Sequence, residues 1–126
     1  MTRHVLLIED EANITEAIRF LLTRDGWRVD THADGSDAVE VVRRIAPDLV
    51  ILDVMLPGRS GFDILRELRD IDACRDLPVL MLTARGQSRD REMAERAGVS
   101  RFMTKPFSNA EVLEAVRDLY ARAEQR

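Results

Sequence analysis

The sequence predicts an α/β fold, a single-domain, doubly wound, five-stranded parallel sheet flanked by five helices. Short β-rich runs alternate along the chain with segments in which apolar residues recur at helical spacing. Several of the runs are apolar at nearly every position, as expected of parallel strands that are buried on both faces. The 126 residues suit one domain with its own core, so residues 1–126 are expected to fold as one unit.

Five short runs are the expected strands. They lie at residues 4–9, 28–33, 48–53, 78–82 and 100–103. The first, third and fourth runs are almost continuously apolar. Because strands alternate with helical segments, we expect right-handed crossover connections that place helices on both faces of the sheet.

Helical spacing marks the segments between the runs. In the first segment five apolar residues recur at i, i+3, i+4, i+7 and i+8, namely Ile14, Ala17, Ile18, Leu21 and Leu22. Gly26 then stops this helix. Two further helices are predicted near residues 36–46 and 62–71. The last helix begins with Ser108 and Glu111, whose types and spacing predict a capping box.

Composition and charge exclude several classes of protein. The net charge is −4 without a block of like charge, so no nucleic-acid footprint is visible. The early apolar run Val5–Ile8 is too short for a signal peptide or a membrane span, which favours a cytoplasmic protein. Cys74 is the only cysteine and is interpreted as a spare thiol near a loop. His4 and His32 are interpreted as strand-end residues rather than metal ligands.

Polar and charged residues follow four of the predicted strands. They are Glu9, Asp10 and Glu11 after the first strand, Asp53 after the third, Thr83 after the fourth and Lys105 after the fifth. In doubly wound sheets ligands bind beyond the carboxyl ends of the strands, so these residues should form one site. Lys105 is the only lysine among 19 basic residues. Its compact ammonium group suits a small anionic site better than the planar fork of arginine does.

With these residues the chain resembles the receiver domain of two-component response regulators, the CheY-like family. The matching motifs are Ile8-Glu9-Asp10-Glu11, Asp53-Val54-Met55-Leu56-Pro57-Gly58, Leu82-Thr83-Ala84 and Lys105-Pro106-Phe107. The resemblance covers the whole chain and implies a flavodoxin-like sheet in the order 2-1-3-4-5. It also implies that Asp53 accepts a phosphoryl group from a sensor histidine kinase or a histidine phosphotransfer protein.

The resemblance further implies a Mg²⁺ cofactor, held with the help of Glu9 and Asp10. Phosphate oxygens beside Asp10 and Asp53 would meet like charge, at about 4 kcal/mol per pair at 4 Å and an effective dielectric of 20. A divalent cation reverses that sign. Because Mg²⁺ prefers oxygen ligands and keeps several waters, Asp10 and Asp53 are the expected direct ligands. Glu9 is expected to act through water, and Met55 through its backbone carbonyl.

Asp53 is then the nucleophile that forms an acyl phosphate. The resemblance implies that Thr83 and Lys105 contact the phosphoryl oxygens, and Lys105 is expected opposite Asp10 and Asp53. It also implies a cis peptide bond between Lys105 and Pro106, which would aim the lysine at the acids.

The resemblance places the switch on the fourth and fifth strands and the helices that follow them. Thr83 is expected to move inward on phosphorylation, and Phe102 to turn from exposed to buried. Phe102 has no hydroxyl to anchor either state. The helix over residues 89–97 has few apolar residues, so we expect it to be the most mobile helix and to move during switching.

Some positions depart from the family pattern. Ser100, Arg101 and Ala115 stand where transcription-factor relatives carry the residues of a dimer salt bridge, so that dimer is not favoured. The downstream partner is then a protein target or an effector domain outside this chain, with no direct nucleic acid or membrane contact. Met55 and Arg85 occupy positions that tune the lifetime of the phosphoryl group in the family.

Two other classes of function stay open. A Mg²⁺-dependent phosphatase of haloacid-dehalogenase type also uses an aspartyl phosphate, but it needs a second acid two residues after the nucleophile, where this chain has Met55. The other is an interaction module that takes no phosphate. The preferred reading is not an enzyme but a signalling domain that promotes its own phosphorylation and dephosphorylation.

Overall fold

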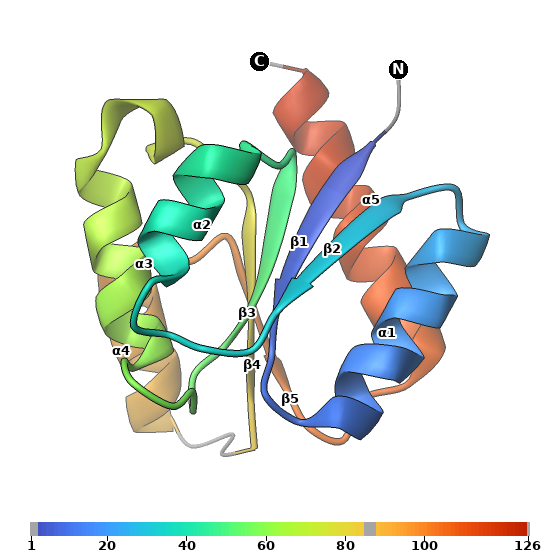
Figure 1. The fold of residues 1–126 in the computed structure, drawn as a ribbon, viewed down its shortest axis with the longest axis horizontal. Coiled ribbons are helices and arrows are strands. Elements are labelled where there is room, and N and C mark those ends of the chain that lie inside the picture. Colours follow the sequence, from blue (N-terminus) through green and yellow to red (C-terminus); the bar gives the residue numbers. More distant parts are fainter. Residues whose placement is uncertain (1–2, 85–87, 126) are drawn as a thin grey trace.

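The five predicted strands form one parallel sheet in the order β2-β1-β3-β4-β5, which confirms the predicted fold. The structure is a computed structural model that describes residues 3–84 and 88–125. The strands are β1 (His4–Ile8), β2 (Arg28–His32), β3 (Leu49–Asp53), β4 (Val79–Thr83) and β5 (Arg101–Thr104). Each lies within one or two residues of its predicted range. Figure 1 shows the sheet between two layers of helices.

The helices occupy the predicted segments. They are α1 (Ala12–Arg24), α2 (Ala38–Ile45), α3 (Gly61–Asp70), α4 (Ser88–Ala97) and α5 (Asn109–Glu124), with a short 3₁₀ helix η1 (Asp72–Cys74) after α3. The capping box is confirmed, because Ser108 accepts from the backbone N–H of Glu111 and the Glu111 carboxylate accepts from that of Ser108. Ile71, predicted to be helical, lies beyond α3 and packs against the core.

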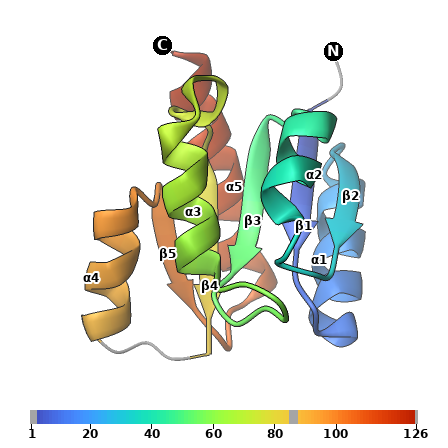
Figure 2. The same cartoon turned by 60° about the vertical axis from the view of Figure 1, so that its left-hand side comes forward.

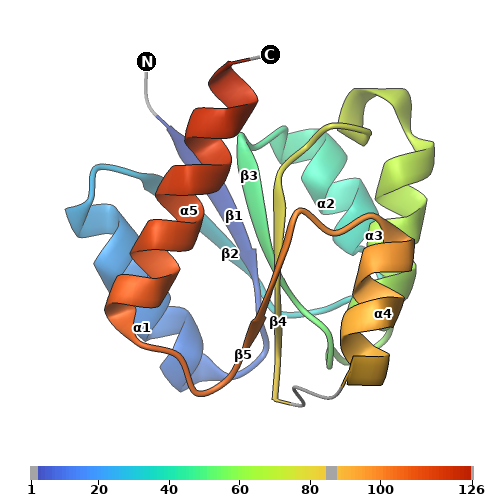
Figure 3. The same ribbon diagram turned by 180° about the vertical axis from the view of Figure 1, so that it is seen from behind.

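The sheet separates two hydrophobic cores. Residues of α2, α3 and α4 pack on one face, and residues of α1 and α5 pack on the other (Figures 1 and 3). The strand side chains alternate between the two cores: Leu6 and Ile8 belong to the first, Val5 and Leu7 to the second. This alternation explains the continuously apolar strands, because side chains on both faces of the sheet are buried in a core.

As its sequence suggests, α4 buries little apolar surface against the rest of the fold. It stands beside α3 at the β5 edge of the sheet (Figure 2). Among its described residues only Ala94 and Ala97 are buried, and alanine removes little apolar surface from water. Burial of so little surface fits the predicted mobility of α4, which stays a prediction.

The two histidines lie at strand ends, as predicted. His4 begins β1 and His32 ends β2, and they pair with Asp30 at 2.5 Å and Asp37 at 2.7 Å. Cys74 is a free cysteine at the end of η1, next to a turn, in agreement with the prediction of a spare thiol near a loop, and its side chain is buried in the core. None of the helices among residues 3–84 and 88–125 has the length and apolar character needed to cross a membrane.

Candidate functional site

The carboxyl ends of β1, β3 and β4, and the start of the segment after β5, meet at one edge of the sheet. The strand register explains the meeting, because Ile8 lies opposite Leu52 and Thr83 lies opposite Thr104. The residues that follow these positions therefore face one another. Each of Glu9, Asp10 and Asp53 offers one carboxylate oxygen, and these three oxygens lie within 4.8 Å of one another.

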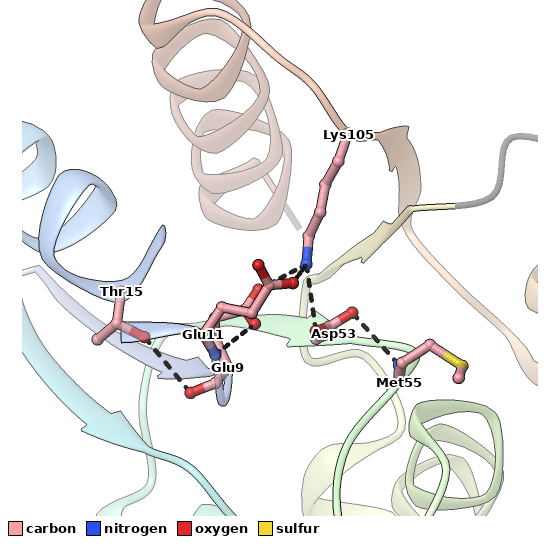
Figure 4. A network of polar contacts seen from close by, with 6 residues as sticks. All are labelled: Glu9, Glu11, Thr15, Asp53, Met55 and Lys105. Atoms are coloured by element: carbon pink, nitrogen blue, oxygen red, sulfur yellow. Dashed lines mark hydrogen bonds and ion pairs between the residues drawn. The ribbon is translucent and has the colours of Figure 1, made fainter. Parts of the chain in front are cut away.

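Lys105 is the cation at the centre of this acidic cluster. Its Nζ lies 3.0 Å from Oε1 of Glu9 and 3.2 Å from Oδ2 of Asp53 (Figure 4). Only 11% of the Lys105 side chain is exposed. Its backbone N–H donates to the carbonyl of Thr83 at 2.7 Å, and the Lys105–Pro106 peptide bond is cis. The hydrogen bond to Thr83 fixes the backbone of Lys105 beside the end of β4.

Burial and charge act in opposite directions on Lys105. Burial by itself lowers the pKa of the ammonium group, whereas the close contact with Glu9 and the charges of Asp53 and Glu9 raise it. The attraction prevails, and the pKa of Lys105 lies above its ordinary value. Lys105 is therefore a permanent positive charge at neutral pH.

Glu11 is a further partner of Lys105; its sequence position groups it with the site but predicts no specific role for it. Its Oε1 lies 3.2 Å from Nζ, and its backbone N–H donates to Oε2 of Glu9 at 3.1 Å. The only sequence signal for it was its place behind Glu9 and Asp10. Of the two acids expected opposite Lys105, Asp53 is in direct contact with it, whereas Asp10 is exposed and is not among its ion-pair partners in the described part of the chain.

Glu9 is the most perturbed acid of the site. Burial and a hydrogen bond with Asp53 raise the pKa of its carboxyl group to about 7. Its side chain is fully buried, and Oε1 accepts no well-directed hydrogen bond from any described residue, although it contacts the ammonium of Lys105. A buried carboxylate oxygen with spare acceptor capacity, aimed at two other acids, is suited to a cation.

The raised pKa predicts that the metal-free protein loses stability as the pH rises. The folded state holds a proton on Glu9 up to about pH 7, whereas an unfolded glutamate releases it near the ordinary value of 4.5. Between these values the folded state binds more protons, so the free energy of unfolding should fall by about 1–3 kcal/mol between pH 5 and pH 8. Urea titrations in EDTA, with Glu9→Gln as the control that lacks the titrating group, measure this. Parallel pH profiles for the two proteins would contradict it.

Asp53 is buried and held from two sides. Its Oδ1 accepts a hydrogen bond from the backbone N–H of Met55 at 3.3 Å, while Oδ2 faces Lys105. The start of α3 packs tightly behind it: a Cβ on Gly61 would lie 2.3 Å from the carbonyl oxygen of Asp53. Glycine at this position therefore permits the close approach that fixes Asp53.

Thr83, Phe102 and Met55 lie around this cluster. Thr83 is buried at the end of β4, and Met55 is exposed in the loop after β3. Phe102 is half-buried in β5, and the guanidinium of Arg91 lies 5.2 Å from the centre of its ring. Arg85 lies outside the described residues.

The donor set fits Mg²⁺. Three carboxylates converge from β1 and β3, and oxygen is the ligand that Mg²⁺ prefers. The buried Oε1 of Glu9 is the feature of the fold that most directly favours a bound cation.

Comparison with known proteins identifies similar receiver domains and response regulators. The family profile described as the response regulator receiver domain matches residues 5–117. The transcriptional regulatory protein TcrX of Mycobacterium tuberculosis is 43% identical over 118 residues, which are 94% of this chain and 50% of TcrX. The phosphate regulon transcriptional regulatory protein PhoB of Escherichia coli is 38% identical over 122 residues, 97% of this chain and 53% of PhoB. The chain thus spans about half the length of these relatives.

Solved structures match the fold along nearly the whole chain. The receiver domain of the sensor histidine kinase PA1611 from Pseudomonas aeruginosa superposes with a TM-score of 0.88 at 31% identity, covering 96% of this chain and 99% of that one. That domain was solved with a magnesium ion coordinated in its active-site cleft. The chemotaxis response regulator CheY4 of Vibrio cholerae superposes with a TM-score of 0.88 at 25% identity, covering 94% of this chain and 99% of that one.

Proposed function

The chain belongs to the response regulator receiver domain family, and from this premise we propose that it is a phosphorylation-controlled signalling switch whose phosphoryl acceptor is Asp53. The observation that carries the proposal is the position of the Asp53 carboxylate. It is buried, 3.2 Å from the ammonium of Lys105, and shares a cluster with Glu9 and Asp10. A carboxylate held in this way is a nucleophile beside a cation for the incoming oxygens.

In the proposed reaction a carboxylate oxygen of Asp53 attacks the phosphorus of a phosphohistidine. The new O–P bond forms as the P–N bond breaks, and the electron pair leaves with the imidazole of the donor. Lys105 neutralises charge on the transferring oxygens, and the hydroxyl of Thr83 donates to one of them. Mg²⁺, held by the carboxylates of Asp10 and Asp53, by Glu9 through water and by the Met55 carbonyl, would offset the remaining negative charge.

The proposed output is a change on the surface formed by β4, α4, β5 and α5. Thr83 ends β4, and a shift of its hydroxyl toward the phosphoryl group would change the positions of α4 and of the Phe102 side chain. The donor would be a sensor histidine kinase or a histidine phosphotransfer protein. The receiver of the signal would be a protein target or an effector domain, since the chain spans half of relatives that are transcriptional regulators.

The proposed function does not include the salt-bridged dimer of transcription-factor relatives, because this chain lacks the charged residues for it. Ala115 is fully buried and presents no charge to a partner. Arg101, which stands at an expected acidic position, lies 3.9 Å from Asp118 of its own chain.

One experiment tests the proposed function. The protein is incubated with Mg²⁺ and a small phosphodonor such as acetyl phosphate, and its intact mass is measured. A receiver gains one phosphoryl group, and the adduct does not form in EDTA. A phosphatase would instead turn over added phosphomonoesters, and an interaction module would do neither; each of these outcomes contradicts the proposal.

A further inference from the structure

The first turn of α4 borders a cleft beside the proposed phosphoryl acceptor. The cleft holds about 390 Å³, and its walls include Met55 after β3, Thr83 at the end of β4, and Arg89 of α4. Asp53 lies next to it, because its Oδ1 accepts from the backbone N–H of Met55 and its strand neighbour is Leu82. Figure 2 shows the start of α4 at the same end of the sheet as the carboxyl ends of the strands.

Arg89 is a cation on this wall that has no partner among the residues described by the structure. It is exposed, and it makes no hydrogen bond, ion pair or ring contact with any residue in the described ranges 3–84 and 88–125. Its neighbour Arg91 is already engaged over the ring of Phe102. Lys105, the cation on the other side of Asp53, already contacts three carboxylates. Among the described residues along this cleft, Arg89 is therefore the cation whose charge is available to a new anion.

Phosphorylation would create such an anion. Phosphorylation converts the Asp53 carboxylate into an acyl phosphate, but the doubly charged phosphoryl group together with Asp10 and Glu11 still carries more negative charge than Lys105 and a divalent cation offset. A guanidinium forms short, charge-assisted hydrogen bonds to phosphoryl oxygens. The positive end of the α4 dipole points toward the same region.

Resting on the proposed function, we propose that Arg89 is a second cationic contact of the phosphoryl group, made across the cleft on the side of Asp53 away from Lys105. The contact draws the first turn of α4 toward the site. Because α4 buries little beyond Ala94 and Ala97, a single new ion pair is enough to change its position. Arg89 thereby links the modified aspartate directly to the proposed output surface.

Asp90 lines the same cleft and acts in the opposite direction. Its carboxylate is repelled by the phosphoryl group that attracts Arg89. Removing the charge of Arg89 should therefore weaken binding of a phosphoryl mimic, and removing the charge of Asp90 should strengthen it. A purely structural role of this helix turn would not produce opposite effects.

The test titrates the protein with trifluoroberyllate, a phosphoryl mimic, in the presence of Mg²⁺. The variants are Arg89→Gln, Arg89→Lys and Asp90→Asn, with Arg96→Gln as the matched control, since Arg96 is exposed on the last turn of the same helix. Arg89→Gln should raise the apparent Kd about threefold to tenfold, the effect of losing one exposed charge-assisted hydrogen bond. Arg89→Lys should stay within about twofold of the parent, and Asp90→Asn should lower the Kd.

Hydrogen exchange over residues 88–97 provides the second readout. The mimic should protect the first turn of α4 in the parent protein and in Arg96→Gln, and this protection should be lost in Arg89→Gln. Equal thermal unfolding of the ligand-free proteins shows that the variants fold alike. If Arg89→Gln matches Arg96→Gln in affinity and exchange, Arg89 does not contact the phosphoryl group. A parent protein that binds no mimic and gains no phosphoryl group overturns the proposed function itself.

Discussion

Asp53→Asn is expected to abolish the phosphoryl adduct while the fold is retained. Asparagine has nearly the same shape, so its side-chain oxygen can still accept from the backbone N–H of Met55. Its amide, however, is not a nucleophile toward phosphorus. The phosphorylated fraction after incubation with acetyl phosphate and Mg²⁺ should therefore fall at least about a hundredfold, as for the loss of a nucleophile. Intact mass spectrometry measures it.

The same variant has a second expected effect. Because the hydrogen bond and the charge of Asp53 both raise the pKa of Glu9, Asp53→Asn should move that pKa down toward its ordinary value. The loss of stability between pH 5 and pH 8 should then become smaller. Asp72→Asn is the matched control, since Asp72 is 91% exposed and pairs with Arg75. An adduct on Asp53→Asn comparable to that on Asp72→Asn would assign the phosphoryl group to another residue.

Lys105→Arg is expected to impair phosphorylation about tenfold to a hundredfold, although it preserves the charge. The ammonium lies 3.0–3.2 Å from three separate carboxylates, and the side chain is 11% exposed. A guanidinium is broader and planar, and its donors cannot converge on three carboxylates around one point. It would displace the phosphoryl oxygens or the acids that hold Mg²⁺.

The yield of adduct at a fixed time with acetyl phosphate and Mg²⁺ measures this prediction. Arg75→Lys is the control for the reverse exchange at an exposed ion pair with Asp72, where either cation should serve. Circular dichroism separates misfolding from a local defect. If Lys105→Arg reached the parental yield and the parental exchange pattern over α4, charge alone would be what the site requires.

Much of the fold could be predicted because its signals are local. The apolar runs of β1, β3 and β4 carry their burial in their own composition, and the capping box of Ser108 and Glu111 needs four consecutive residues. The burial of Cys74 has no such local signal. Its neighbours in sequence are mostly charged, and its side chain is buried because it belongs to the core shared with α2 and α3.

The site was predictable to the extent that strand ends determine it. Parallel strands bring their carboxyl ends to one edge, so Glu9, Asp53 and Thr83 could be grouped before any coordinates were known. Strand ends carry no information about which side chains touch. Lys105 was expected opposite Asp10 and Asp53, and in the structure it pairs with Asp53 and also with Glu9 and Glu11.

The sequence by itself determined the order of the elements, the acids at the edge of the sheet and the single lysine beside them, because each is written in residue type and spacing. Tertiary structure alone decided the raised pKa of Glu9, the contacts of Lys105 with three carboxylates and the position of Arg89 along the cleft. These properties depend on distance and burial between residues as far apart as β1 and the end of β5, and short-range patterns in a chain do not encode them.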